Sequence, residues 1–235
     1  KYIFKIKSFK DGSACRTFAV ATGLQNYGYI AIPVIERVFG KDLLGIMLLH
    51  NMGVELALWS LGIIILNGKA EKGSLKKIIN GPTIAVIISL LINFVGFDAY
   101  IPKAVAVSID QVGAAFIPLG LILVGTTIYG FRDSPAFSRK KWGEAASVMC
   151  CGTLLRSGLL PIMIIFMATL MPYTVELRKV VIIEAAMPAA FFPIVLAKHY
   201  KGRPDIALYV AMSTLLLGFI FLPFWVSLGR NMLGV

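Results

Sequence analysis

Seven long runs of apolar residues follow one another along the chain, separated by short polar stretches. A helix needs about 20 largely apolar residues to cross the hydrocarbon core of a bilayer, with a usual range of about 17–25. The pattern therefore predicts an all-α integral membrane protein with about seven transmembrane helices. The predicted helices cover residues 16–35, 44–66, 78–97, 109–131, 145–171, 180–197 and 206–228.

The polar stretches between the runs are short and carry turn residues, such as Asn67-Gly68 and Asp133-Ser134-Pro135. The sequence contains no long polar or Ser/Gly-rich linker that would divide it. We therefore expect a single transmembrane domain over residues 1–235.

Composition supports a lipid environment. Hydrophobic residues make up 58% of the sequence and charged residues 15%, whereas a soluble domain has about 45–50% and roughly 25%. The net charge of +11 would suit a nucleic-acid binder only if the cations shared one accessible face. They fall instead in the loops between the apolar runs, so we expect a lipid bilayer as the partner and no nucleic acid.

The distribution of the basic residues predicts the orientation in the membrane. Alternate loops, counted from the N-terminal stretch, hold 16 Lys and Arg residues, and the remaining loops hold 6. Cytoplasmic loops are enriched in Lys and Arg. The N-terminus is therefore predicted to be cytoplasmic and the C-terminus outside.

The first apolar run is interrupted by polar residues and a proline. On a continuous helix, Thr22, Gln25, Asn26 and Tyr29 would share one face, and Pro33 would break the helix after them. Backbone groups freed at membrane depth persist only where protein or a watery cavity satisfies them. Two interpretations stay open: a broken helix that lines a substrate site, or a kinked packing helix.

The sixth run has the same character, with Glu184 before Pro188 and Pro193. It crosses the membrane in the opposite direction to the first run, and each has an Ala-x-Pro, ending at Pro33 and at Pro188. Proline-interrupted helices at corresponding positions of antiparallel halves indicate an inverted-repeat transporter. We expect the two breaks to meet near the middle of the bilayer.

This symmetry predicts how the chain is divided. Residues 68–235 would form one complete five-helix repeat, and residues 1–67 would form the last two helices of its partner. We therefore expect three further helices before residue 1, in a ten-helix protein.

Several stretches resemble the auxin efflux carrier family of permeases, in particular its bacterial malate and malonate permease-like members. The resemblance covers nearly the whole chain. The matching stretches are Asn26-Tyr-Gly-Tyr-Ile-Ala-Ile-Pro33, Leu58-Trp-Ser-Leu-Gly62, Phe116-Ile-Pro-Leu-Gly-Leu-Ile-Leu-Val-Gly125, Glu184-Ala-Ala-Met-Pro-Ala-Ala190, Leu196-Ala-Lys-His-Tyr200, Ser213-Thr-Leu215 and Leu222-Pro223.

The resemblance implies a ten-helix fold of two inverted five-helix repeats, with two proline-broken helices that cross at the substrate site. It places Asn26 and Pro33 in the first crossover motif, Pro188 in the second, and Asn51 among the polar site residues. It also implies transport of organic anions such as malate-like carboxylates or auxin-like acids, association into homodimers, and a location in the bacterial inner membrane.

Charged residues inside predicted helices are candidates for function, because they are costly in a bilayer. Glu55 lies on one helix face with Asn51 and Trp59, and it and Glu184 are candidates for coupling transport to H⁺ or Na⁺. The alternative for Glu55 is a structural role as the partner of a cation. Arg156 either binds a substrate carboxylate, as Gln25 and Asn26 would through their amides, or pairs with Glu55 or reaches for the membrane surface.

These features predict a secondary transporter that moves a small organic anion by alternating access. An anion channel and a seven-helix receptor are the alternatives. The sequence has no zinc-hydrolase, nucleophile-elbow or phosphate-loop motif, and its cysteines and histidines are not spaced as metal ligands. We therefore expect no catalytic residue, cofactor or metal.

Overall fold

The structure is a computed structural model that describes residues 11–68, 81–131 and 142–235. Most of the basic residues on which the predicted orientation depends, and the predicted turn at 133–135, lie outside the described residues. The orientation therefore stays a prediction.

The first part of the chain forms helices up to the gap at 69–80. These are α1 (Gly12–Gly23), α2 (Ala31–Phe39), the short 3-10 helix η2 (Lys41–Leu43), α3 (Leu44–Ala57), the π-helical stretch η3 (Leu58–Gly62) and α4 (Ile63–Asn67). The next part is α5 (Gly81–Phe94), the 3-10 helix η5 (Phe97–Tyr100), α6 (Lys103–Ala114) and α7 (Phe116–Gly130).

The last part begins after the gap at 132–141. It consists of α8 (Trp142–Thr153), the π-helical stretch η8 (Leu154–Leu159), α9 (Leu160–Leu170), α10 (Val175–Ala186), α11 (Phe192–His199) and α12 (Pro204–Leu233). Each of the seven predicted apolar runs therefore contains helical segments where the structure describes it. Four described helices are long and apolar enough to span a membrane, namely Lys41–Asn67, Lys103–Gly130, Trp142–Leu170 and Pro204–Leu233. The full number of seven spans stays a prediction.

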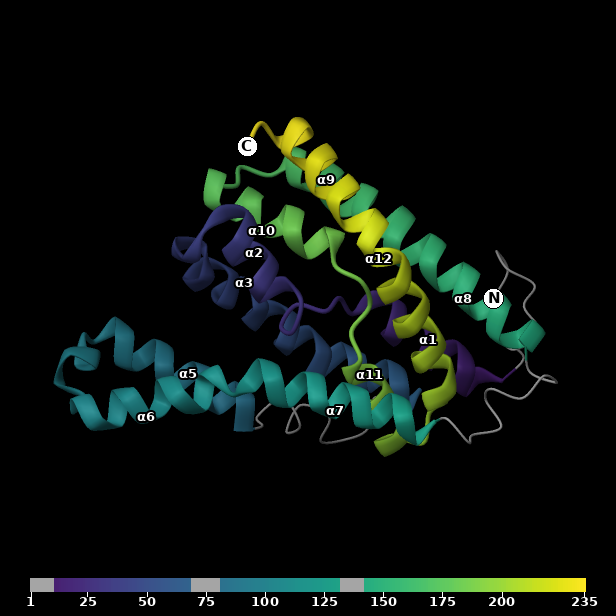
Figure 1. The fold of residues 1–235 in the computed structure, drawn as a ribbon, viewed down its shortest axis with the longest axis horizontal. Helices are drawn as coiled ribbons and strands as arrows, with labels where there is room; N and C mark the ends of the chain where they lie inside the picture. The colour runs from purple at the N-terminus through teal and green to yellow at the C-terminus, as the bar shows by residue number, and fades with distance from the viewer. Residues whose placement is uncertain (1–10, 69–80, 132–141) are drawn as a thin grey trace.

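The core of the molecule is built by α1–α4 and α8–α12 (Figure 1). One buried cluster joins α1, α8, α11 and α12, and a second joins α2, α3, α9, α10 and α12. Close approach of the helices is possible where one of them carries glycine. At Gly152 in α8, for example, an added Cβ would lie 3.0 Å from the Val210 side chain of α12.

Helices α5, α6 and α7 form a separate layer along one edge, and α5 and α6 extend beyond the core (Figure 1). Within the described part of this layer, α6 has no buried residue and α7 has only Gly120. The exposed side chains are large and apolar, including Val112 at 75% and Ile122 at 62% exposure. Lipid tails solvate such a surface as well as a protein core does.

The α5–α7 layer meets the core through apolar side chains of α7, such as Val124 and Ile128, and through one aromatic stack. Tyr29, between α1 and α2, stacks on Phe116 at the start of α7, with ring centroids 5.0 Å apart. The Tyr29 ring also occupies the space that a Cβ atom on Gly120 would need. This contact places α7 beside the break between α1 and α2.

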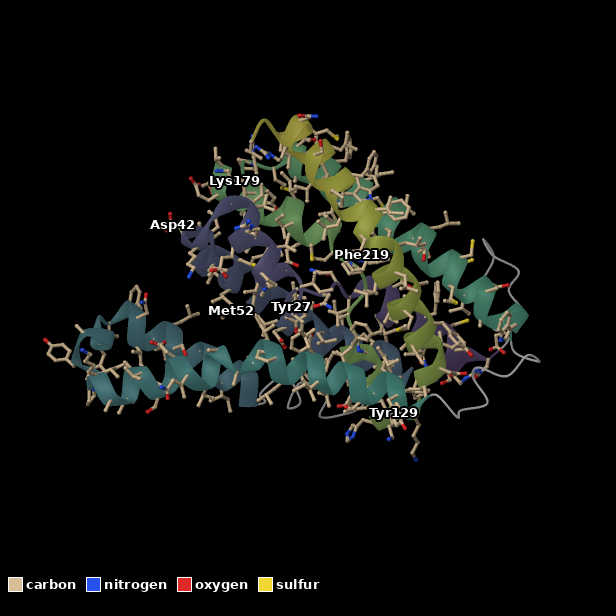
Figure 2. The ribbon with its side chains drawn as sticks, in the orientation of Figure 1. Tyr27, Asp42, Met52, Tyr129, Lys179 and Phe219 are labelled. Atoms are coloured by element: carbon tan, nitrogen blue, oxygen red, sulfur yellow. The ribbon has the colours of Figure 1, made fainter. Side chains whose placement is uncertain are left out.

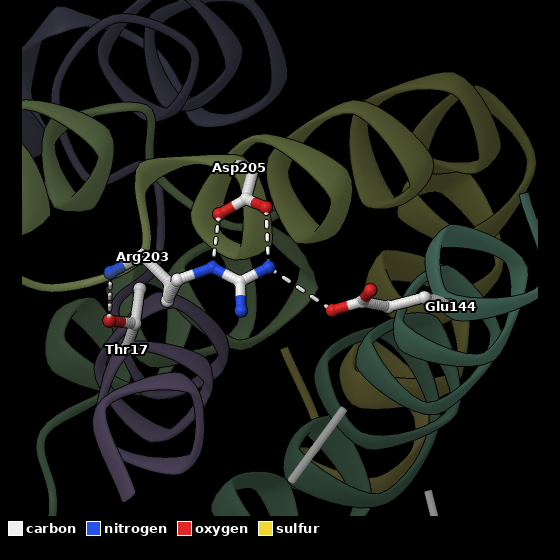
Figure 3. Close-up of polar contacts among 4 residues, drawn as sticks. All are labelled: Thr17, Glu144, Arg203 and Asp205. Atoms are coloured by element: carbon white, nitrogen blue, oxygen red, sulfur yellow. Dashed lines mark hydrogen bonds and ion pairs between the residues drawn. The ribbon is translucent and has the colours of Figure 1, made fainter. Parts of the chain in front are cut away.

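A polar junction joins three helices of the core at the start of α12 (Figure 3). The Arg203 backbone N–H donates to Thr17 Oγ1 of α1 at 3.0 Å. The guanidinium donates to both oxygens of Asp205, at 2.9 and 2.6 Å, and to Glu144 of α8 at 3.1 Å. The Asp205 bonds, followed by the charges of Asp205 and Glu144, raise the pKa of Arg203, so the junction stays charged.

Candidate functional site

The candidate site lies where the two broken helices cross. Helix α1 ends at Gly23, and the next residues are not helical until α2 begins at Ala31. Leu24 is extended, with φ −90° and ψ 118°. The first predicted run is therefore a broken helix.

The second break separates α10 from α11 and follows from Pro188. The residue before a proline is pushed out of the helical region by the proline ring, and Met187 has φ −68° and ψ 141°. Helix α10 accordingly ends at Ala186. Pro193 falls in the first turn of α11, where a missing N–H is tolerated.

The two breaks are joined by backbone hydrogen bonds. Gln25 and Ala189 form an antiparallel bridge. The Asn26 N–H donates to the Pro188 carbonyl, and the Ala190 N–H donates to the Leu24 carbonyl, both at 2.9 Å. Each break thus supplies partners for backbone groups that the other leaves without helical bonds, as burial requires.

The position expected for the first break is wrong. Pro33 is the third residue of α2 rather than the point of interruption, which lies upstream at residues 24–30. A proline in the first helical turn leaves the helix intact, because that N–H has no partner within the helix. Thr22, Gln25, Asn26 and Tyr29 therefore do not share one continuous helix face.

Two asparagines hold the first break in place. Asn26 is 3% exposed, and its Oδ1 accepts the Ile30 N–H at 3.3 Å, just before α2 begins. Asn51 of α3 is 6% exposed and donates from Nδ2 to the Tyr27 carbonyl at 3.0 Å. Asn51 Oδ1 is buried without a hydrogen-bond partner. Both predicted polar residues therefore lie at the crossing.

A cavity of about 200 Å³ lies beside the crossing. Its walls contain the amides Gln25 and Asn26, one carboxylate, Glu55, and no Lys, Arg or His among the described lining residues. The other side chains are mainly aromatic rings, namely Tyr27, Tyr29, Trp59, Phe116, Phe191 and Phe192. Tyr27 is partly buried and lies near the middle of the view in Figure 2, whereas Tyr129 lies at the edge of the molecule.

Both oxygens of Glu55 accept hydrogen bonds within the cavity wall. Oε1 accepts from the Tyr27 hydroxyl, and Oε2 accepts from the Trp59 indole N–H at 2.7 Å. The Trp59 ring in turn contacts Phe192 edge-on, with centroids 5.8 Å apart. Glu55 thus fixes the orientation of two of the rings around the cavity.

Arg156 lies outside the cavity and donates hydrogen bonds to backbone carbonyls at the second break. It is 1% exposed and sits in the π-helical stretch η8. Its Nε donates to the Met187 carbonyl at 2.9 Å, and its Nη2 donates to the Glu184 carbonyl at 3.1 Å. The guanidinium therefore satisfies carbonyls at the end of α10, and of the three predicted roles the structure favours a structural one, although with backbone partners.

Glu184 is buried in the last turn of α10, with 3% exposure. Gln25 lies next to its carboxylate, but neither carboxylate oxygen has a hydrogen bond of acceptable geometry. Gln25 also lines a second hollow of about 480 Å³ between α1 and α3. Of the predicted site residues, Gln25, Asn26 and Glu55 line the 200 Å³ cavity, whereas Pro33, Asn51, Arg156, Glu184 and Pro188 do not.

Sequence reasoning missed most of the aromatic wall. Phe116 comes from α7 and Phe191 and Phe192 from the second break, so only the fold brings them to Tyr27 and Tyr29. The one available signal was their occurrence beside the glycine and proline residues that interrupt the apolar runs.

Sequence comparison places these features among transporters. A family model described as membrane transport protein matches residues 70–226. An uncharacterized transporter of Methanothermobacter thermautotrophicus is 25% identical over 232 residues, which cover 95% of this chain and 71% of that protein. An uncharacterized transporter of Methanocaldococcus jannaschii is 27% identical over 209 residues, covering 86% of this chain and 63% of that protein. No solved structure matches the chain with significance.

Proposed function

Because this chain belongs to the membrane transport protein family, we propose that it is a secondary transporter that moves a small organic anion by alternating access. The observation that carries the proposal is the crossing of two broken helices, joined by backbone hydrogen bonds, beside a cavity. Discontinuous helices of this kind form the substrate sites of transporters built from repeats. The inverted repeat, the homodimer and the bacterial inner membrane stay predictions of the sequence.

The proposed anion is held by N–H groups rather than by a cation. Helix α11 begins at Phe192 in the cavity wall, and α2 begins at Ala31, soon after wall residues 25–29. The N-terminal ends of helices carry partial positive charge and free N–H groups, which suit an anion. The amides of Gln25 and Asn26 add donors beside them.

The cavity favours a monocarboxylate with an apolar body over a dicarboxylate. A second carboxylate would lose its hydration without meeting a cation in the wall, which is costly. Aromatic rings offer apolar contact instead. Ligand pockets are usually about 300–1,000 Å³, so a cavity of about 200 Å³ supports a small solute.

Counterflow in liposomes tests the proposal. The whole gene product that contains this chain is reconstituted, and labelled mono- and dicarboxylates are offered at graded concentrations. We expect saturable exchange of small monocarboxylates and weaker exchange of dicarboxylates. Flux that rises linearly with concentration supports the channel alternative, and the absence of flux with every carboxylate rejects the proposal.

Variants of Asn26 separate binding from folding. Asn26→Asp keeps an oxygen that can accept the Ile30 N–H, but it adds negative charge at the cavity. We expect carboxylate transport to fall by at least about tenfold, which corresponds to 1.4 kcal/mol, with little change in melting temperature. Asn231→Asp, at an exposed site near the end of α12, is the matched control. Unchanged transport by Asn26→Asp would reject the site.

A further inference from the structure

Glu184 differs from the other carboxylates that the structure describes. Both of its carboxylate oxygens are buried and lack a hydrogen-bond partner, whereas Glu55 has a donor on each oxygen. It also lies in the last turn of α10, two residues before the helix ends at Ala186, next to the crossing of the broken helices.

This environment disfavours the ionised form of Glu184. An ionised carboxylate costs far more to bury without partners than a neutral one does. The C-terminal end of a helix carries partial negative charge, which adds to that cost. The neutral carboxylic acid is therefore the form that fits the structure.

The charged and titratable groups around Glu184 do not offset the cost of burying its ionised form. Arg156 is the nearest cation, but its Nε and Nη2 bond the carbonyls of Met187 and Glu184. Tyr27 is the neighbour from the first break, and it is committed to Glu55. Helix α9 carries no titratable side chain, and α12 carries them only near its ends, at Asp205, Tyr209 and Arg230. The titratable residues of α2 are Glu36 and Arg37, toward its C-terminal end, and Glu36 pairs with Lys41. Those of α3 are His50 and Glu55.

A proton fits this position better than a metal cation. Na⁺ or another hard cation needs several oxygen ligands, and the carbonyls beside Glu184 are occupied by the Arg156 guanidinium. The positive charge of that guanidinium would also repel a metal cation. Among the described residues, no cluster of three or more His, Cys, Asp or Glu side chains could hold a metal.

We propose that Glu184 carries the proton that accompanies the substrate anion. In the conformation described here the carboxylic acid is neutral and buried. When the crossing opens to water on one side, its O–H bond breaks, the proton passes to water, and the carboxylate is solvated or paired with Arg156. One proton moving with one monocarboxylate makes the transport step electroneutral. This inference rests on the proposed function.

The first test needs no substrate. Folding of the wild-type protein takes up a proton at Glu184, because the unfolded carboxyl ionises above its ordinary pKa near 4.3. Stability contributed by the protonated group is therefore lost as pH rises. We expect the melting temperature of Glu184→Gln, relative to wild type in detergent, to rise steadily from pH 5 to pH 8. Parallel wild-type and variant curves would overturn the proposal.

Glu176→Gln is the control for this titration. Glu176 is exposed at the start of α10, and a backbone hydrogen bond together with Thr174 lowers its pKa. It is ionised in both the folded and the unfolded protein above about pH 5. Its effect on the melting temperature should therefore stay constant from pH 5 to pH 8.

The second test uses the carboxylate identified by counterflow, in liposomes with a pH gradient and an internal pH-sensitive dye. We expect the wild type and Glu176→Gln to accumulate the carboxylate with uptake of protons, and Glu184→Gln to lose this accumulation by at least tenfold. Glu184→Asp, which can still carry a proton, should retain part of it. Accumulation by Glu184→Gln, or accumulation driven only by Na⁺, would overturn the proposal. Failure of every carboxylate in counterflow rejects the proposed function instead, and the melting curves still decide the protonation of Glu184.

Discussion

The guanidinium of Arg156 lies at the end of α10, where it donates to the Met187 carbonyl and to the Glu184 carbonyl, which also accepts the Met187 N–H. A charged donor to a carbonyl contributes more than a neutral one, about 1.5–3 kcal/mol for each bond. Because both bonds reach the backbone, Arg156 fixes the shape of the break rather than the identity of a ligand. We therefore expect Arg156 to affect transport indirectly, through the shape of the break.

Replacing Arg156 tests this role. Arg156→Met should lower the free energy of unfolding by about 1.5–3 kcal/mol, since the Met187 carbonyl loses its donor and the Glu184 carbonyl keeps only the Met187 N–H. The free energy of unfolding of Arg156→Lys should lie between those of the wild type and Arg156→Met, because an ammonium group donates hydrogen bonds but lacks the fixed fork of donors. Melting temperatures in detergent provide the measurement. Arg178→Met is the control, since Arg178 is half-buried and donates from Nη1 to the Leu233 carbonyl at 3.1 Å.

A different outcome would indicate that Arg156 binds the substrate. If Arg156→Met melts like the wild type but has lost carboxylate transport, the guanidinium contacts the anion in another conformation. If stability and transport fall together and Arg156→Lys restores both in proportion, the structural role holds.

Individual residues could be predicted in part. The shared face of Asn51, Glu55 and Trp59 follows from helical spacing, and the Glu55–Trp59 bond confirms it. The partner of Arg156 could not be predicted, because the carbonyls that it bonds become free only when α10 ends. Tyr27, on the first break, likewise meets Glu55 only through tertiary structure.

The positions of the helices could be predicted well from hydropathy, and the positions of their breaks could be predicted less well. Pro188 was placed correctly, since Met187 before it must be extended. Pro33 was misplaced, because a proline fits the first turn of α2 and the position of the break depends on pairing with residues 188–190. The π-helical stretches η3 and η8 have no local signal in the sequence.

The contact of α7 with the first break gives a prediction for Gly120. Gly120→Ala should destabilise the protein by about 1–3 kcal/mol, because the new methyl group needs the space that the Tyr29 ring fills. It should also weaken carboxylate binding, since Tyr29 and Phe116 line the cavity. Melting temperature and the half-saturating concentration for transport are the measurements.

Gly125→Ala, one and a half turns further along α7, is the matched control. Nothing lies within 4 Å of a Cβ atom at Gly125, and alanine favours a helix over glycine by about 0.5–1 kcal/mol. This variant should be neutral or slightly stabilised. Equal effects of the two substitutions would show that the Tyr29 contact is absent from the protein in a membrane.

The molecule as a whole consists of a packed core and a layer, α5–α7, whose apolar side chains are largely exposed. Hydropathy predicted all of these helices alike, because a lipid-facing helix and a buried one have similar composition. The division into two parts therefore could not be predicted from the sequence.

Two valines test this division. Val210 in α12 is 0% exposed and Val112 in α6 is 75% exposed. Val210→Ala should destabilise by about 1–2 kcal/mol through lost packing, whereas Val112→Ala should leave the melting temperature almost unchanged, because lipid or detergent refills the space. Comparable losses at both sites would mean that another protein surface, such as a second copy, covers α6.

The pairing of Gln25 with Ala189 has a consequence for biogenesis. Most of the chain lies between the two breaks, so the first enters the bilayer well before the ribosome has made the second. At about 5–20 residues per second, the backbone groups near Gln25 wait on the order of ten seconds for their partners. During that interval they need water, the insertion machinery or a chaperone, and a pause in translation before α10 would lengthen the exposure to degradation.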